Sequence, residues 1–221
     1  MTHVIAIDGP AGSGKSSVSR ELAKRLSYAY LDTGAMYRAV AVAAKRRRID
    51  MKDEEALGNL CAVLDITLVS RGSVPGILLG EEDISVEIRS PEMDMLSSAV
   101  SAVPSVRQGM TVLQRRMARR YEGVVAEGRD MGTVVFPDAK DKFFLTAAVE
   151  VRAERRYRER LERGERPSSL RVKEEMKKRD AQDENRAAAP LRAASDAVII
   201  DSTNLSIDGV IGIILDHIRK N

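Results

Sequence analysis

The sequence predicts an α/β fold in which helices flank a parallel β-sheet. Short apolar runs alternate with helical patterns along most of the 221 residues, and this alternation is typical of parallel sheets with right-handed crossovers. Tryptophan is absent and aromatic residues make up only 4%, so aliphatic side chains must fill the core, as in a sheet covered by helices. A glycine-rich segment joins the first strand to the first helix, where such folds bind ligands.

The N-terminal stretch from His3 to Arg20 is predicted to form a strand, a loop and a helix. Its loop matches G-x-x-x-x-G-K-[ST], in which backbone N–H groups surround phosphates, the lysine reaches the β and γ phosphates and the hydroxyl holds Mg²⁺. The helix dipole favours the same anion. We therefore expect a nucleoside triphosphate and Mg²⁺ to bind here, with Ser16 holding the metal. The loop residues are Gly9, Pro10, Ala11, Gly12, Ser13, Gly14, Lys15, Ser16 and Ser17.

The next part of the chain predicts one more core strand, two helices and an insertion. Residues 28–31 form the strand, Thr33 should cap the helix that follows, and Asp53 should cap a helix over residues 54–64. Three short segments, ITLVS, GILLG and DISVE, predict small antiparallel strands. Gly72, Pro75, Gly76 and Gly80 separate them.

The second half returns to core strands and helices. Ser90 with Pro91 predicts one helix start and Pro104 another, because proline suits the first helical position. Strands are expected at 123–126, 142–145 and 197–200, charged helices at 147–163 and 169–186, and a last helix capped by Ser206. Polar residues should converge at the carboxyl edge of the sheet beside the glycine loop. They are Asp8, Asp32, Thr33, Glu127, Arg129, Asp130 and Asp201.

Several charged residues could bind a phosphate-bearing ligand. Arg38 and Arg129 follow strand ends, and guanidinium groups bind phosphate bidentately; a solvated arginine is the alternative. Arg179, Asp183 and Arg186 share one helix face. They could form either a ribose and phosphate clamp or an ion-pair ladder. Three further arginines that could face a triphosphate are Arg152, Arg155 and Arg156.

Composition excludes several classes of protein. The 36 basic residues nearly balance 33 acidic ones, and this balance is too even to imply nucleic-acid binding. Three basic runs leave a nucleotide-dependent RNA-binding protein as an alternative. The salt dependence of RNA binding would test that alternative. One cysteine, Cys61, excludes an internal disulfide. With neither a leader nor an 18-residue apolar run, we expect a cytoplasmic protein without membrane contact.

Six stretches of the chain together resemble the bacterial cytidylate kinases. They are GPAGSGKS, LDTGAMYR, EIRSPE, EGRDMGTVVFPDA, RDAQDENRAAAPL and VIIDSTNLSID. The resemblance implies a P-loop kinase with a five-stranded parallel core over residues 1–64 and 105–221, an inserted α+β monophosphate-binding lobe at 65–104 and a short lid at about 155–172. It also implies transfer of the γ-phosphoryl group of ATP to CMP or dCMP. We expect the protein to be a monomer. Kinases acting on UMP, AMP or shikimate are the nearest alternatives.

The resemblance assigns residue roles as well. ATP would contact the glycine loop, Arg155 and Arg156, and the transferring group would meet Lys15, Arg129 and Arg186. The acceptor would contact Thr33, Tyr37, Arg38, Ser98, Arg107, Arg129, Asp130, Arg179, Asp183 and Arg186. Within that set, Ser98, Arg107 and Asp130 would read cytosine, and Arg179 and Asp183 the sugar. Asp8, Glu127 and Asp130 remain alternatives for the acid that supports the metal. After Ser90-Pro-Glu the family usually continues Val-Ser-Asn, whereas this chain has Met93-Asp94-Met95.

Overall fold

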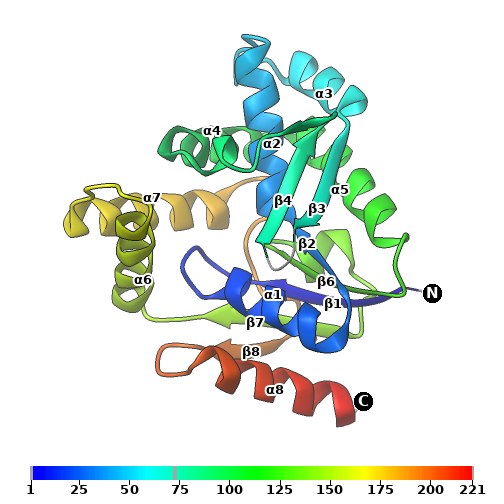
Figure 1. The fold of residues 1–221 in the computed structure, drawn as a ribbon, viewed down its shortest axis with the longest axis vertical. Helices are drawn as coiled ribbons and strands as arrows, with labels where there is room; N and C mark the ends of the chain where they lie inside the picture. Colours follow the sequence, from blue (N-terminus) through cyan, green and yellow to red (C-terminus); the bar gives the residue numbers. More distant parts are fainter. Residues whose placement is uncertain (1, 72–73, 221) are drawn as a thin grey trace. The chain divides into compact units, whose positions relative to one another are not determined.

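The structure, a computed structural model, describes residues 2–71 and 74–220 (Figure 1). The chain divides into two compact units, Met1–Tyr30 with Tyr121–Asn221, and Leu31–Arg120. The lobe predicted at 65–104 lies within the second unit, which extends beyond those limits on both sides. The boundaries given for the core, the lobe and the lid stay predictions. Gly72 lies outside the described residues.

A five-stranded parallel sheet is confirmed, with the strand order β2-β6-β1-β7-β8. The strands are β1 (His3–Asp8), β2 (Ala29–Asp32), β6 (Gly123–Gly128), β7 (Asp141–Thr146) and β8 (Val198–Asp201). Parallel pairing joins β1 to β6 and β7, and β7 to β8. Every residue of β6 is buried, as expected of a central strand covered on both faces.

Four α-helices lie in the described part of the first unit: α1 (Lys15–Leu26), α6 (Val149–Glu162), α7 (Ser169–Asn185) and α8 (Ile207–Lys220). Apolar residues of α1 and α8, such as Leu22 and Ile211, share one core cluster with Ile7 and Phe143 of the sheet. These two helices therefore pack on the same side of the sheet (Figure 1). The predicted cap of α8 is confirmed, because the Ser206 hydroxyl accepts a bond from the Gly209 N–H at 3.1 Å.

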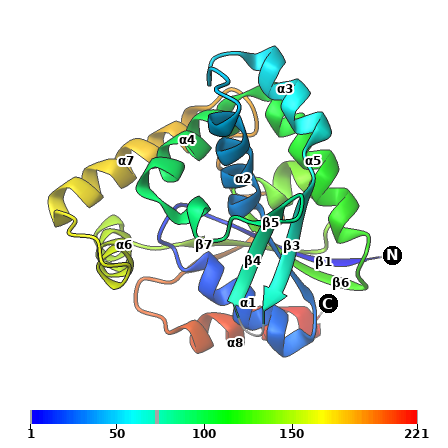
Figure 2. The ribbon, with the colours of Figure 1, turned by 45° about the horizontal axis from the view of Figure 1, so that its top comes forward.

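The second unit contains α2 (Thr33–Arg46), α3 (Glu54–Val63), α4 (Pro91–Ala102) and α5 (Pro104–Ala118). Figure 2 shows α2 beside α4, and α3 packs against α5. Ser90 and Asp53 cap their helices as predicted. The cap predicted for α2 is wrong by one residue. The Asp32 carboxylate, not the Thr33 hydroxyl, accepts a bond from the Ala35 N–H at 2.8 Å. Aspartate is the stronger N-cap of the two.

The small antiparallel sheet of this unit consists of β3 (Ile66–Arg71), β4 (Val74–Leu79) and β5 (Glu82–Asp83). The third predicted strand, DISVE, is mostly wrong. The Ser85 hydroxyl accepts a bond from the Ile77 N–H at 2.9 Å, so a side chain takes the place of the next backbone partner. The strand ends at Asp83, and a 3-10 turn follows at Glu87–Arg89.

Candidate active site

The loop between β1 and α1 has the backbone shape that its motif predicts. Gly9, Gly12 and Gly14 have φ angles of +148°, +73° and +92°. Residues other than glycine rarely adopt such positive φ angles. A Cβ atom on Gly9 would lie 2.0 Å from the carbonyl oxygen of Leu145. The glycines are therefore needed both for the turn and for the close approach to β7.

Three carbonyl groups of this loop are held by side chains. The Lys15 ammonium donates to Pro10 O at 2.7 Å, Arg152 Nη1 donates to Ala11 O at 3.1 Å, and the Ser202 hydroxyl donates to Ser13 O at 2.9 Å. A trans peptide points its C=O and N–H groups in opposite directions. The N–H groups of residues 11, 12 and 14 therefore point away from these donors, as a phosphate-binding loop requires.

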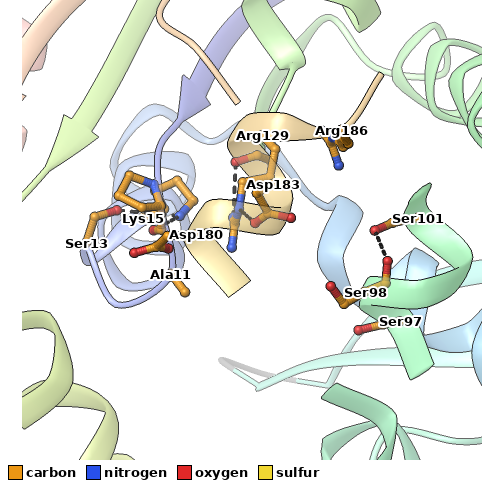
Figure 3. Close-up of polar contacts among 12 residues, drawn as sticks. Ala11, Ser13, Lys15, Ser97, Ser98, Ser101, Arg129, Asp180, Asp183 and Arg186 are labelled. Atoms are coloured by element: carbon orange, nitrogen blue, oxygen red, sulfur yellow. Dashed lines mark hydrogen bonds and ion pairs between the residues drawn. The ribbon is translucent and has the colours of Figure 1, made fainter. Parts of the chain in front are cut away.

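Lys15 is buried at the base of the loop with only 6% of its surface exposed. Besides Pro10 O, its ammonium group contacts the Ser13 hydroxyl at 3.4 Å (Figure 3). Burial and the nearby charge of Arg129 lower the pKa of Lys15 to about 7, against the opposing effects of Glu127 and Asp8. In the free protein this lysine thus sits where its charged form is poorly stabilised, and an added polyanion would stabilise it.

Ser16, the predicted metal-holding residue, donates its hydroxyl to Glu127 Oε2 at 3.0 Å. Glu127 is the penultimate residue of the buried strand β6. Its other oxygen accepts a bond from the Tyr30 hydroxyl. Asp8 is used differently, since its oxygens accept bonds from the N–H groups of Met131 and Gly132, both at 2.8 Å. Burial outweighs these bonds and raises the pKa of Asp8 to about 6. Glu127, one of the candidate acids, is therefore in direct contact with Ser16.

In the first unit, two of the residues that are predicted to bind the acceptor form an ion pair. Arg129 Nε lies 2.8 Å from Asp183 Oδ2, and Figure 3 shows the two side chains facing each other. Burial acts to raise the pKa of Asp183, but the charges of Arg129 and Arg179 hold it below its usual value. Arg186, just past α7, donates from Nε to the Ala189 carbonyl at 2.6 Å.

Arg155 and Arg156, predicted to contact ATP, lie on α6. Arg155 donates to the hydroxyl and the carbonyl of Ser202 at 3.1 and 2.7 Å, and Ser202 is the residue that binds the glycine loop at Ser13. Arg156 pairs with Glu159 at 2.7 Å. Arg155 is thus linked to the loop through one residue, and ATP contact by either arginine stays a prediction.

Arg152, the third arginine that could face a triphosphate, contacts the glycine loop directly, and its role toward a triphosphate stays a prediction. Besides Ala11 O, its guanidinium contacts the Ala147 carbonyl at 3.0 Å and the Asp180 carboxylate at 2.5 Å. It therefore ties the glycine loop to α7. No local sequence pattern predicts these contacts, because Ala11, Arg152 and Asp180 lie far apart in the sequence.

The second unit holds the other predicted acceptor residues. Thr33 and Tyr37 are buried in the first turns of α2, and the Arg107 guanidinium of α5 lies 5.4 Å from the centre of the Tyr37 ring. Arg107 Nη1 also donates to the Ser101 carbonyl at 3.0 Å. Ser101 in turn donates to the Ser98 carbonyl at 2.9 Å (Figure 3). Arg107 and Ser98 are therefore connected through α4.

Arg38 is bound by an acid that the sequence did not single out as a partner. Its Nε and Nη2 atoms lie 3.2 and 2.9 Å from one oxygen of Asp94, which is in the first turn of α4. The two residues are 56 positions apart, so no helical spacing predicts the pair. Asp94 stands in the segment that departs from the usual family pattern.

Comparison with known proteins identifies the family. A profile described as cytidylate kinase matches residues 5–220. A cytidylate kinase of Geobacter sp. strain M21 is 50% identical over 94% of this chain and 89% of its own length. A cytidylate kinase from Methylococcus capsulatus is 49% identical over 99% of this chain and 97% of its own length. The crystal structure of an uncharacterized protein from Eubacterium ventriosum aligns with this structure over the full length of both chains, with a TM-score of 0.54 at 13% identity. This similarity supports the fold alone. The chain belongs to the cytidylate kinase family.

Proposed function

We propose that this protein transfers the γ-phosphoryl group of ATP to CMP or dCMP, giving ADP and CDP or dCDP, in pyrimidine nucleotide metabolism. The observation that carries the proposal is the glycine loop around buried Lys15 in a chain that belongs to this family. The loop geometry supports binding of a triphosphate, and the family supports the acceptor.

On the donor side, backbone N–H groups of the loop would bind the β and γ phosphates of ATP, and Lys15 would neutralise charge on them. The hydroxyl of Ser16 and the carboxylate of Glu127 are hard oxygen donors, the kind that Mg²⁺ prefers, and they already lie 3.0 Å apart. We assign them to the metal. When bound, Mg²⁺ would shield the charge between the β and γ phosphates.

On the acceptor side, the proposal keeps the contacts that the resemblance assigns. Arg38, Arg129 and Arg186, with Thr33, would bind the monophosphate. Ser98, Arg107 and Asp130 would read cytosine, with Tyr37 beside Arg107, and Arg179 and Asp183 would bind the sugar. The depressed pKa of Asp183 supports this role, since an ionised carboxylate is a strong acceptor for a ribose hydroxyl.

The reaction itself would need no general base. A nucleoside monophosphate has a second pKa of about 6, so its attacking oxygen is already anionic at neutral pH. The protein's task is to align the acceptor oxygen with the γ phosphorus and to neutralise charge. A lid at about residues 155–172 would exclude water, which would otherwise accept the phosphoryl group. We expect the protein to act as a monomer in the cytoplasm.

The test is ADP release from ATP and Mg²⁺ with CMP, dCMP, UMP or AMP in parallel. CMP and dCMP should give kcat/KM values about tenfold or more above those for UMP and AMP. A reaction without acceptor measures ATP hydrolysis. Lys15→Ala should abolish turnover with an unchanged melting temperature, because Lys15 contacts the phosphates. A preference for AMP or UMP, or normal turnover in Lys15→Ala, would contradict the proposal.

A further inference from the structure

An ion pair joins α2 to α4 at Arg38 and Asp94. Both contacts, at 3.2 Å from Nε and 2.9 Å from Nη2, go to the same carboxylate oxygen. The side chains are largely shielded, with 23% and 20% of their surfaces exposed. A carboxylate in the first turn of a helix is also favoured by the helix dipole. Asp94 therefore contributes a fixed negative charge on the side of Arg38 that carries Nε.

We infer that Asp94 positions Arg38 for the acceptor phosphate and so sets the affinity for CMP and dCMP. This inference rests on the proposed function, in which Arg38 binds that phosphate. Asp94 engages one edge of the guanidinium, the edge formed by Nε and Nη2. The edge formed by Nη1 and Nη2 is the one that a phosphate would take, since the guanidinium can serve two acceptors at once.

The benefit to affinity comes from order before binding. A free arginine side chain samples many rotamers, and fixing them on binding weakens affinity. With Asp94 in place, that ordering has already happened in the free protein. The acceptor phosphate then meets a guanidinium whose plane is set.

Within the second unit, the Arg38–Asp94 pair links the helix that would bind the phosphate to the helix that would read cytosine. Helix α4 carries Asp94 and also Ser98, which is predicted to read cytosine, whereas α2 carries Arg38 for the phosphate. Any loss of the pair should therefore weaken CMP and dCMP alike, because both have the same base and phosphate. ATP affinity should not change, since the donor loop belongs to the first unit.

A second ion pair between the same helices provides a matched control. Lys45 Nζ lies 2.6 Å from Glu92 Oε2, but both side chains are about half exposed, at 49% and 50%. Exposed pairs of this kind contribute little to stability. Glu92→Gln removes one carboxylate from the first turn of α4, as Asp94→Asn does, without touching Arg38.

The experiment compares Asp94→Asn, Glu92→Gln, Arg38→Ala and the double variant Asp94→Asn/Arg38→Ala. Steady-state kinetics with CMP and dCMP, and calorimetric titration with CMP alone, measure the acceptor site. For Asp94→Asn we expect KM and Kd for CMP to rise about tenfold, equivalent to about 1.4 kcal/mol. The kcat and the KM for ATP should change less than about threefold, and Glu92→Gln should match the wild type.

The double variant tests whether Asp94 acts through Arg38. Asp94→Asn should add almost nothing in the Arg38→Ala background, because the residue that it positions is gone. Additive losses would overturn the inference, as would an unchanged or lower KM for CMP in Asp94→Asn. A lower KM would mean that Asp94 competes with the phosphate for Arg38. If the wild type phosphorylates neither CMP nor dCMP, the proposed function fails and this inference fails with it.

Discussion

Binding of ATP should be coupled to proton uptake, because Lys15 lies in a site that disfavours its charge. Burial and the charge of Arg129 lower its pKa to about 7, and its two bonds go to a carbonyl and a hydroxyl, both neutral acceptors. A bound triphosphate adds several negative charges beside Nζ and should return the pKa toward its ordinary value of about 10.4. The proton must come from solvent.

The size of the effect follows from these two pKa values. At pH 8.5 a lysine with a pKa of about 7 is only about 3% protonated, whereas one with a pKa of about 10.4 is about 99% protonated. ATP binding at this pH should therefore take up about one proton, and binding at pH 7 about half a proton. Affinity for ATP should fall toward tenfold per pH unit above about pH 7, since each unit removes protonated lysine from the free protein.

Calorimetry with Mg-ATP in two buffers of different ionisation enthalpy measures the number of protons directly. At pH 8.5 ATP itself is fully ionised, so it contributes no proton. Lys15→Met keeps a side chain of similar length without a titrating group and should bind with no linked proton. Wild-type uptake below about 0.2 proton at pH 8.5 would show that Lys15 is charged in the free protein and would refute the argument from burial.

Three further predictions concern the loop, the acid limit of stability and the base. Gly12→Ala should be about 1–3 kcal/mol less stable than Gly164→Ala. Both glycines have similar positive φ angles, but only a Cβ atom on Gly12 would lie 2.8 Å from a backbone oxygen. Equal midpoints of urea unfolding for the two variants would contradict this. Asp183 has a depressed pKa in the folded state, so it contributes stability above about pH 4 that is lost at lower pH. Asp183→Asn should flatten the loss of urea stability between about pH 5 and pH 2, and an unchanged slope would count against the pairing with Arg129. Asp130→Asn should lower kcat/KM about a hundredfold for CMP and much less for UMP, and equal losses would remove Asp130 from base recognition.

The sequence predicted those parts of the fold that depend on neighbouring residues. Asp53, Ser90 and Ser206 cap their helices as expected, because a cap needs only a side chain and an N–H two or three residues later. The glycine loop was predictable for the same reason. At α2 the N-cap preference itself favours Asp32 over Thr33, so the cap that the structure shows could have been predicted from the sequence.

The contacts within the candidate site were not predictable in this way. Ser16 meets Glu127 across 111 positions, and Asp8 binds Met131 across 123. The second contact supports a π-helical turn at Met131–Val135, which has no local signal in the sequence. Arg38 and Asp94 meet only because α2 and α4 pack together. A sequence pattern names the chemistry of such residues, but the fold decides their partners.

The order of strands in the main sheet has a consequence for the growing chain on the ribosome. Strand β1 pairs with β6, and His3 lies opposite Gly123, 120 positions later (123 − 3 = 120). At a synthesis rate of about 5–20 residues per second, β1 waits roughly 6–24 s for its neighbour. Its apolar residues Ile5 and Ile7 stay without their sheet partners during that time, whereas residues 31–120 emerge as one continuous segment that can pack first. The middle of this chain should therefore fold before its beginning, and a chaperone that binds nascent apolar segments should find β1 accessible until β6 has left the tunnel.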